Sequence, residues 1–193
     1  MNTQIDAIFN AIAPQLAIKS RLAITDLCEE ETHAAGTLFI QEGQTNGSEY
    51  FLIEGVVRSC LKDQDGRWVT LSFFEENTVL TPYVIRTREG RSSINMEAVT
   101  PCKLLRLDSG RFEALIEVDL SAREFANIVL KNELSRKVDK EIQLISYSSL
   151  ERLKQFRADF HMLENRVPHA MIASYLGITP VSLSRLRSTL STS

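Results

Sequence analysis

The sequence predicts an α+β chain with an N-terminal double-stranded β-helix (jelly-roll) barrel, a long dimerisation helix and a C-terminal helix-turn-helix. Three observations support this order. Short β-rich runs are closely spaced between about Thr32 and Leu107, a helical repeat continues to about Ile145, and two short helices flank Gly177. We therefore expect a barrel domain over residues 1–120, a dimerisation helix over 121–147 and a helix-turn-helix domain over 148–193.

The predicted barrel domain begins with a helix over residues 3–20, because apolar side chains recur there at helical spacing. The β-rich runs that follow are TLFIQ, YFLIEGVVRSCLK, RWVTLSFF, INMEAV and KLLRL, separated by turn residues. Asp65-Gly66 predicts a tight hairpin with positive φ at both turn positions. Short strands punctuated in this way are typical of a sandwich or a jelly roll.

A long helix should follow the barrel. Ser121 and Glu124 have the spacing of a capping box, in which each side chain bonds the other residue's backbone N–H. About 25 residues at 1.5 Å each make a rod of roughly 37 Å. Its apolar stripe could pack on the barrel or on a second copy of the chain. We expect a dimer interface, formed by Leu130, Leu134, Val138 and Ile142.

The last segment predicts a helix-turn-helix. A second capping box, Ser148 with Glu151, starts one helix, and Asn165 is expected to cap the next. Gly177 then supplies the positive φ that ends a helix, and Thr179 with Pro180 suits the start of another. The apolar face of the last helix is Leu183, Leu186 and Leu190.

The opposite face of that last helix is polar, which favours contact with DNA. It carries Val181, Ser182, Ser184, Arg185 and Ser188, and a helix in this position of the motif enters the major groove. The alternative is an ordinary helical hairpin in a bundle.

The distribution of charge agrees with DNA contact at one end only. The net charge of the chain is −3, but residues 1–147 hold 16 basic and 22 acidic residues, whereas residues 148–193 hold 6 and 3. No acid follows Asn165, while Arg166, Arg185 and Arg187 do. A basic end on an acidic body is expected if only that end touches phosphates.

Other functional classes find little support. The cysteines Cys28, Cys60 and Cys102 are far apart, so we expect reduced thiols in a cytoplasmic protein, with no metal and no disulfide. The start MNTQIDAIFNAIAP lacks a signal-peptide pattern, and no apolar run could cross a membrane. Metal-dependent barrel enzymes need several converging histidines, and of the three histidines only His33 lies near the predicted barrel, so we expect no enzyme.

The order of these elements resembles the bacterial Crp/Fnr family of transcription regulators. YFLIEGVVRSC (50–60) and DQDGRWVTLSFF (63–74) are similar to a barrel strand and hairpin of that family, and RVPHAMIASYLGITPVSLSRLR (166–187) is similar to its helix-turn-helix. The resemblance implies a cyclic-nucleotide-binding-like barrel and a homodimer that binds double-stranded DNA. RNA polymerase is a further implied partner.

The resemblance also implies roles for single residues. Pro180, Val181 and Arg185 occupy the positions from which the family reads bases, and Arg185 can take guanine O6 and N7 together. Val181 stands where the family usually has glutamate, which implies a different or looser operator. Candidates for phosphate contacts are Thr179, Ser182, Arg187 and Ser188.

The barrel departs from the cyclic-nucleotide pattern of the family. Leu80 and Thr81 stand where relatives have a glycine and a glutamate, while Arg91, Ser92 and Ser93 stand near the phosphate-binding arginine. Arg91 could supply the charge if the loop shifts by one residue. We expect that cyclic AMP does not bind, and that the barrel senses another small molecule or none. A ligand-sensing or protein-interaction module that no longer reads DNA is the alternative for the whole chain.

Overall fold

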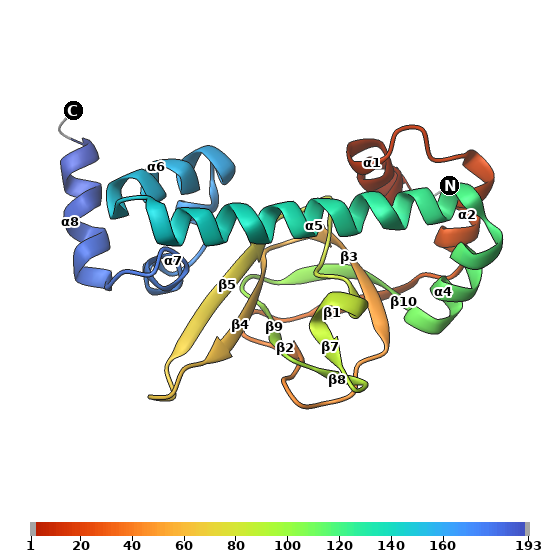
Figure 1. Ribbon diagram of the computed structural model, residues 1–193, viewed down its shortest axis with the longest axis horizontal. Coiled ribbons are helices and arrows are strands. Elements are labelled where there is room, and N and C mark those ends of the chain that lie inside the picture. The colour runs from red at the N-terminus through yellow and green to blue at the C-terminus, as the bar shows by residue number, and fades with distance from the viewer. Residues whose placement is uncertain (1–2, 192–193) are drawn as a thin grey trace.

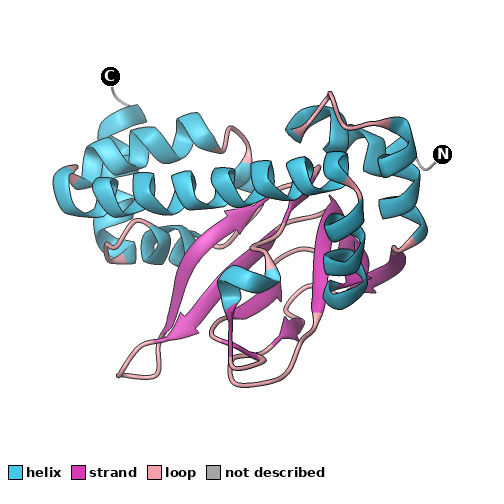
Figure 2. Ribbon diagram, turned by 45° about the vertical axis from the view of Figure 1, so that its right-hand side comes forward, coloured by secondary structure: helices cyan, strands magenta, loops and turns pink. Residues whose placement is uncertain are grey.

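The computed structural model describes residues 3–191 and has the expected α+β architecture (Figure 1). A barrel of two four-stranded antiparallel sheets lies under one long helix, α5 (Leu120–Ser146). Helices α1 and α2 lie near one end of α5, and α6 to α8 lie near the other. The view in Figure 2 shows the same long helix across the strands.

The N-terminal segment forms two helices, so the single helix predicted over residues 3–20 is wrong. Helix α1 covers Thr3–Ile12 and α2 covers Ile18–Asp26. Pro14 explains the break, because proline lacks the N–H that the next helical turn would need and disfavours the helical conformation of the preceding residue. Arg21 holds the connection by donating from Nε to the Leu16 carbonyl (2.9 Å) and from Nη2 to the Pro14 carbonyl (2.9 Å).

The barrel consists of two sheets with strand orders β1-β10-β3-β6 and β2-β9-β4-β5, and β7 pairs with β8 beside them. The strands are β1 Glu29–His33, β2 Leu38–Ile40, β3 Ser48–Glu54, β4 Val57–Lys62, β5 Trp68–Phe74, β6 Thr78–Val79, β7 Thr87–Arg88, β8 Arg91–Ser92, β9 Asn95–Ala98 and β10 Cys102–Asp108. Short helix α3 (Tyr83–Arg86) lies between β6 and β7. Alternation along β3 sends Tyr50 and Leu52 into the barrel core and Phe51 and Ile53 to the outer face under α1 and α5.

The hairpin between β4 and β5 forms as expected, but its turn differs. Lys62 pairs with Trp68, and the Gly66 N–H donates to the Asp63 carbonyl (3.0 Å). Only Gly66 has a positive φ (76°), and Asp65 does not. Five residues, 63–67, connect the strands in place of the two-residue turn that Asp-Gly predicts, and a single left-handed glycine closes this longer loop.

The start of the long helix is another correction. Helix α4 (Ser109–Val118) is followed almost at once by α5, and Asp119 caps α5 by accepting from the Ala122 N–H (3.0 Å). The hydroxyl of Ser121 instead accepts from the Ala17 N–H (3.0 Å). The capping box predicted at Ser121 is therefore wrong, since Asp119 occupies the cap two residues earlier.

The C-terminal part contains α6 (Ser149–Asp159), a short 3-10 helix (Leu163–Asn165), α7 (His169–Tyr175) and α8 (Pro180–Ser191). The capping box between Ser148 and Glu151 is confirmed. The cap predicted at Asn165 is wrong, because that residue ends the 3-10 helix and Pro168 precedes α7. These helices share a core with Phe73 of β5, whose ring centroid lies 6.3 Å from that of Phe156.

Candidate nucleic-acid interface and effector cavities

The turn between α7 and α8 has the local geometry that the sequence predicts. Gly177 has φ 66°, and the Ile178 N–H reaches back to the Ala173 carbonyl (3.0 Å), which closes the end of α7. The hydroxyl of Thr179 accepts from the Ser182 N–H (3.1 Å) and caps α8. Ala173 is fully buried, so the small side chain lets the two helices pack closely.

The predicted base-reading side chains lie on the exposed side of α8. Leu183 is 1% exposed and faces the core, whereas Val181 is 61% exposed. Pro180 and Arg185 are exposed as well. Within residues 3–191 no ion pair of Arg185 is found, so its guanidinium is available at the surface. Among the predicted phosphate contacts, Thr179 and Ser188 are exposed and Ser182 is half-buried.

Arg187 is placed differently from the other candidates on α8. Its Nε lies 2.8 Å from Oε1 of Glu164, and its Nη1 lies 2.9 Å from His169. Glu164 also binds Arg157 (2.7 Å). The charge of Arg187 is therefore paired within the helix-turn-helix part. Its partner Glu164 stands just before the acid-free segment of the sequence, but the fold brings the two side chains together.

Arg166 connects the helix-turn-helix part to the barrel. Its guanidinium pairs with Glu76 and lies 3.5 Å from Glu75, both in the loop after β5. A hydrogen bond from the Arg166 side chain is the main cause that lowers the pKa of Glu76 below its usual value. Of the three arginines after Asn165, two are thus engaged in contacts within the molecule.

The predicted dimer stripe on α5 is mostly exposed in the single chain. Leu134 is 64% exposed, Val138 46% and Ile142 49%, whereas Leu130 is half-buried. Ile145, one turn further, extends the same stripe and is 79% exposed. Large apolar side chains repeated at this spacing along a surface helix favour packing against another helix.

The five residues predicted for the effector pocket do not line one cavity. Leu80 lines a cavity of about 210 Å³ beside Glu133 and Arg136. Thr81 and Ser93 line a different cavity of about 450 Å³ between the barrel, α5 and α7. Arg91 is exposed and donates to the Gly43 carbonyl (2.8 Å), and Ser92 is buried, donating to the Ile94 carbonyl (2.7 Å).

The larger of these two cavities contains basic residues that the sequence reasoning missed. Lys137 and Lys140 of α5 and Arg86 of α3 line it. The Lys140 ammonium lies 3.2 Å from the centroid of the Tyr175 ring and donates to the Tyr175 carbonyl. Burial, with Arg152 acting in the same direction, lowers the pKa of Lys140 to about 7. The sequence does contain a signal for Lys137 and Lys140, because both lie beside the apolar stripe of the long helix.

Glu133 is a second residue that was missed. It is 3% exposed, and its carboxylate accepts from the Thr81 hydroxyl (2.9 Å) and pairs with Arg136 and Lys137. Burial acts to raise its pKa, but the two basic neighbours hold the pKa below its usual value. Glu133 thereby ties α5 to the loop that precedes α3.

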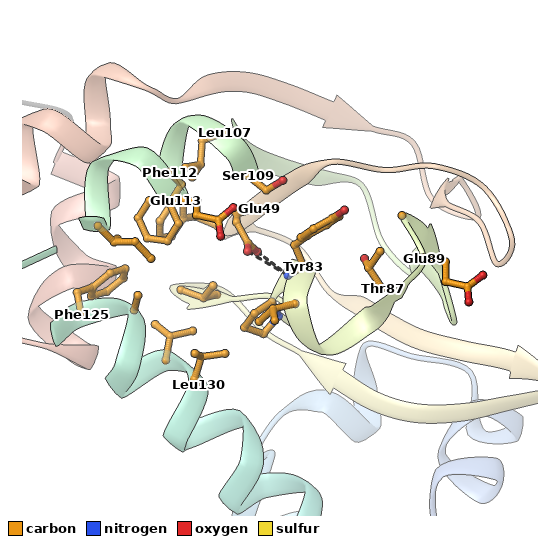
Figure 3. Close-up of a pocket in the computed structure, with 18 residues that line it drawn as sticks. Glu49, Tyr83, Thr87, Glu89, Leu107, Ser109, Phe112, Glu113, Phe125 and Leu130 are labelled. Carbon is orange, nitrogen blue, oxygen red and sulfur yellow. Dashed lines mark hydrogen bonds between the residues drawn. The ribbon is translucent and has the colours of Figure 1, made fainter. Parts of the chain in front are cut away.

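A third cavity, of about 440 Å³, lies between β3, α3, α4 and the first half of α5 (Figure 3). Most of its wall is aromatic or aliphatic, and Glu49 stands in it as a half-buried acid. No predicted residue except Leu130 lines it.

Metal and membrane sites are not evident in the described part of the chain. Among residues 3–191, no group of three or more His, Cys, Asp or Glu side chains could hold a metal ion. Cys28, Cys60 and Cys102 are free, and burial raises the pKa of Cys28 to about 12. No helix within the described residues is long and apolar enough to cross a membrane.

Comparison with known proteins agrees with the architecture. Residues 30–119 match the cyclic nucleotide-binding domain family. FixK2 from Bradyrhizobium japonicum is 22% identical, with 86% of this chain and 85% of that chain covered and a TM-score of 0.73. The c-di-GMP-responsive global regulator CLP of Xanthomonas campestris is 16% identical, with 91% and 92% covered and a TM-score of 0.70.

A transcriptional regulator assigned to the Crp/Fnr family from Eubacterium rectale is 16% identical, with 93% of this chain and 85% of that chain covered and a TM-score of 0.70. No curated protein sequence matches this chain. Residues 30–119 are therefore similar to the cyclic nucleotide-binding domain family, and the chain has the fold of the solved Crp/Fnr regulators.

Proposed function

We propose that this chain is a sequence-specific, DNA-binding transcription regulator of the Crp/Fnr type, with a regulatory rather than a catalytic role. The observation that carries the proposal is the exposed, capped start of α8, where Arg185 stands at the surface without an ion pair among residues 3–191. A helix presented in this way can enter the major groove, and the fork of an arginine can bind guanine there.

The proposal includes a homodimer joined along α5, with domains at residues 1–120, 121–147 and 148–193. The exposed stripe of Leu134, Val138 and Ile142 supports it, because covering these side chains removes apolar surface from water. Two recognition helices would then face half-sites separated by about one turn of DNA, roughly 34 Å.

We also propose that the effector, if the barrel takes one, is an anion other than cyclic AMP. The cavity of about 450 Å³ supports an anion, because Lys137 and Lys140 line it together with the hydroxyl side chains of Thr70 and Thr81, whereas the guanidinium of Arg86 already donates to Asn46 and Ser48. Its walls come from the barrel, from α5 and from α7, so a ligand there would contact the barrel, the long helix and the first helix of the helix-turn-helix. Leu80 and Thr81, both buried, lack the open backbone and the carboxylate that a cyclic nucleotide would use.

The deciding experiment is selection of bound sequences from a random duplex pool at two salt concentrations. We expect a palindromic consensus and an affinity that falls as salt rises. Arg185→Ala should weaken binding to the selected site by about 1–3 kcal/mol. Arg67→Ala is the matched control, because Arg67 is exposed at the tip of the β4–β5 hairpin and its loss removes the same charge.

Three results would count against the proposal or part of it. Equal binding by Arg185→Ala and Arg67→Ala would remove Arg185 from base reading. No enrichment at either salt concentration, with or without anionic ligands, would favour the alternative of a protein-interaction module. Cyclic AMP should leave the melting temperature unchanged at millimolar concentration, and a clear rise would contradict the reading of Leu80 and Thr81.

A further inference from the structure

The cavity of about 440 Å³ in Figure 3 lies outside the barrel. Its floor is Glu49 and Phe51 of β3, which share the outer face of the sheet because alternate residues of a strand point the same way. Tyr50 and Leu52, from the other face, belong to the barrel core. The cavity shares no lining residue with the one that carries the basic residues, so the two are separate.

The walls of this cavity are apolar and aromatic. Phe112 comes from α4, Phe125 and Val129 come from α5, and Tyr83 comes from α3. The rings of Phe51 and Phe125 are stacked with their centroids 6.3 Å apart, so two packed aromatic rings form one wall of the cavity. A concave apolar space of several hundred Å³ is the usual form of a small-molecule site.

The charged groups that line the cavity are all acidic. They are Glu49, Glu89 and Glu113, and no lysine or arginine is among the described lining residues. The oxygens of Glu49 both accept from the Tyr83 N–H (3.0 and 2.9 Å), which aims the carboxylate at the start of α3. Burial raises the pKa of Glu49 to about 7, although the Tyr83 N–H and the nearby Arg86 act to lower it.

We propose that this cavity binds a small organic cation, an ammonium group on an apolar body. The ammonium would lie by Glu49, and the body would fill the space between Phe112 and Phe125. Aromatic faces attract cations, and a carboxylate that burial leaves poorly solvated gains from a positive partner. An anion would face the carboxylates of Glu49 and Glu113, and no lysine or arginine is among the described residues that line the cavity. This inference goes beyond the proposed function and does not depend on DNA binding.

The test compares three probes that share one body: 3-phenylpropylammonium, 3-phenylpropanoate and 3-phenylpropan-1-ol. Binding to the full chain is measured by calorimetry at about pH 8, above the pKa of the Glu49 carboxyl. We expect the ammonium to bind about tenfold tighter than the carboxylate or better, with the alcohol between them.

Three variants locate the site. Glu49→Gln should remove the preference for the ammonium while leaving the affinity of the alcohol unchanged. Glu117→Gln, an exposed residue of α4 outside the cavity, is the matched control and should behave as the parent chain. Ala126→Leu should weaken all three probes, because the added atoms fill the space. Thermal unfolding of each variant checks that it is folded.

The proposal is overturned if the carboxylate binds as tightly as the ammonium. It is also overturned if Glu49→Gln behaves as Glu117→Gln does, if Ala126→Leu leaves binding intact, or if no probe binds at millimolar concentration.

Discussion

Replacing Glu49 by glutamine should stabilise the protein, and the gain should depend on pH. The pKa of the Glu49 carboxyl is raised by burial from its ordinary value of 4.5 to about 7. Each unit of pKa is worth about 1.4 kcal/mol, so burying the charged form costs about 3 kcal/mol. Glutamine carries no charge, and its carbonyl oxygen can still accept from the Tyr83 N–H.

The direction of the pH dependence follows from the protonation of Glu49 in the folded and the unfolded chain. Below about pH 4.5 the Glu49 carboxyl is protonated in both the folded and the unfolded chain, so there is no penalty. Between about 4.5 and 7 the folded state binds more protons, so this carboxyl lowers stability as the pH rises. Above about 7 the penalty is complete. Glu49→Gln should therefore match the parent chain near pH 4.5 and exceed its free energy of unfolding by about 3 kcal/mol near pH 8.

Urea unfolding at several pH values, at one fixed protein concentration, measures this difference. The fixed concentration matters because the stability of a dimer depends on it. Glu113→Gln is the control, since Glu113 lines the same cavity but is exposed to solvent, and its stability should follow that of the parent chain. If the gain in stability of Glu49→Gln over the parent chain is no larger at pH 8 than at pH 4.5, the carboxyl of Glu49 is not desolvated and the reasoning fails.

Three further predictions concern the interfaces of the molecule. Leu134→Glu with Val138→Glu should halve the mass in light scattering, because charge cannot be buried along α5, and an unchanged mass would exclude this helix as the interface. Phe73→Ala should lower the free energy of unfolding by about 3–5 kcal/mol in urea titration, since Phe73 is buried against the C-terminal helices, and a loss below about 1 kcal/mol would contradict that packing. Gly177→Val should cost at least about 1–2 kcal/mol, measured in the same way, because φ is 66° there, and an unchanged stability would show that the turn is not left-handed.

The sequence predicts best those features that neighbouring residues settle among themselves. The cap of α8 by Thr179 and the capping box of Ser148 each join residues three positions apart, so their spacing is visible in the chain. The same local reasoning fails at Ser121, because its hydroxyl is taken by Ala17 from a distant segment and Asp119 becomes the cap.

The charges show the same limit. The acid-free run after Asn165 suggests that its arginines are all free to meet phosphate. In the folded chain Arg187 meets Glu164 and Arg166 meets Glu76, which leaves Arg185 as the exposed one. Glu76 lies far away in the sequence, and no spacing rule relates it to Arg166.

The sequence by itself determined the order of the parts: barrel, long helix and helix-turn-helix, with a left-handed glycine in the turn. Hydrophobic periodicity and turn chemistry are properties of short segments, so they can be read along the chain. Only the tertiary structure decided which cavities exist and what charge lines them. Glu49, Tyr83, Phe112 and Phe125 become neighbours because three helices and a sheet pack around one space, and such packing joins residues that the chain keeps apart.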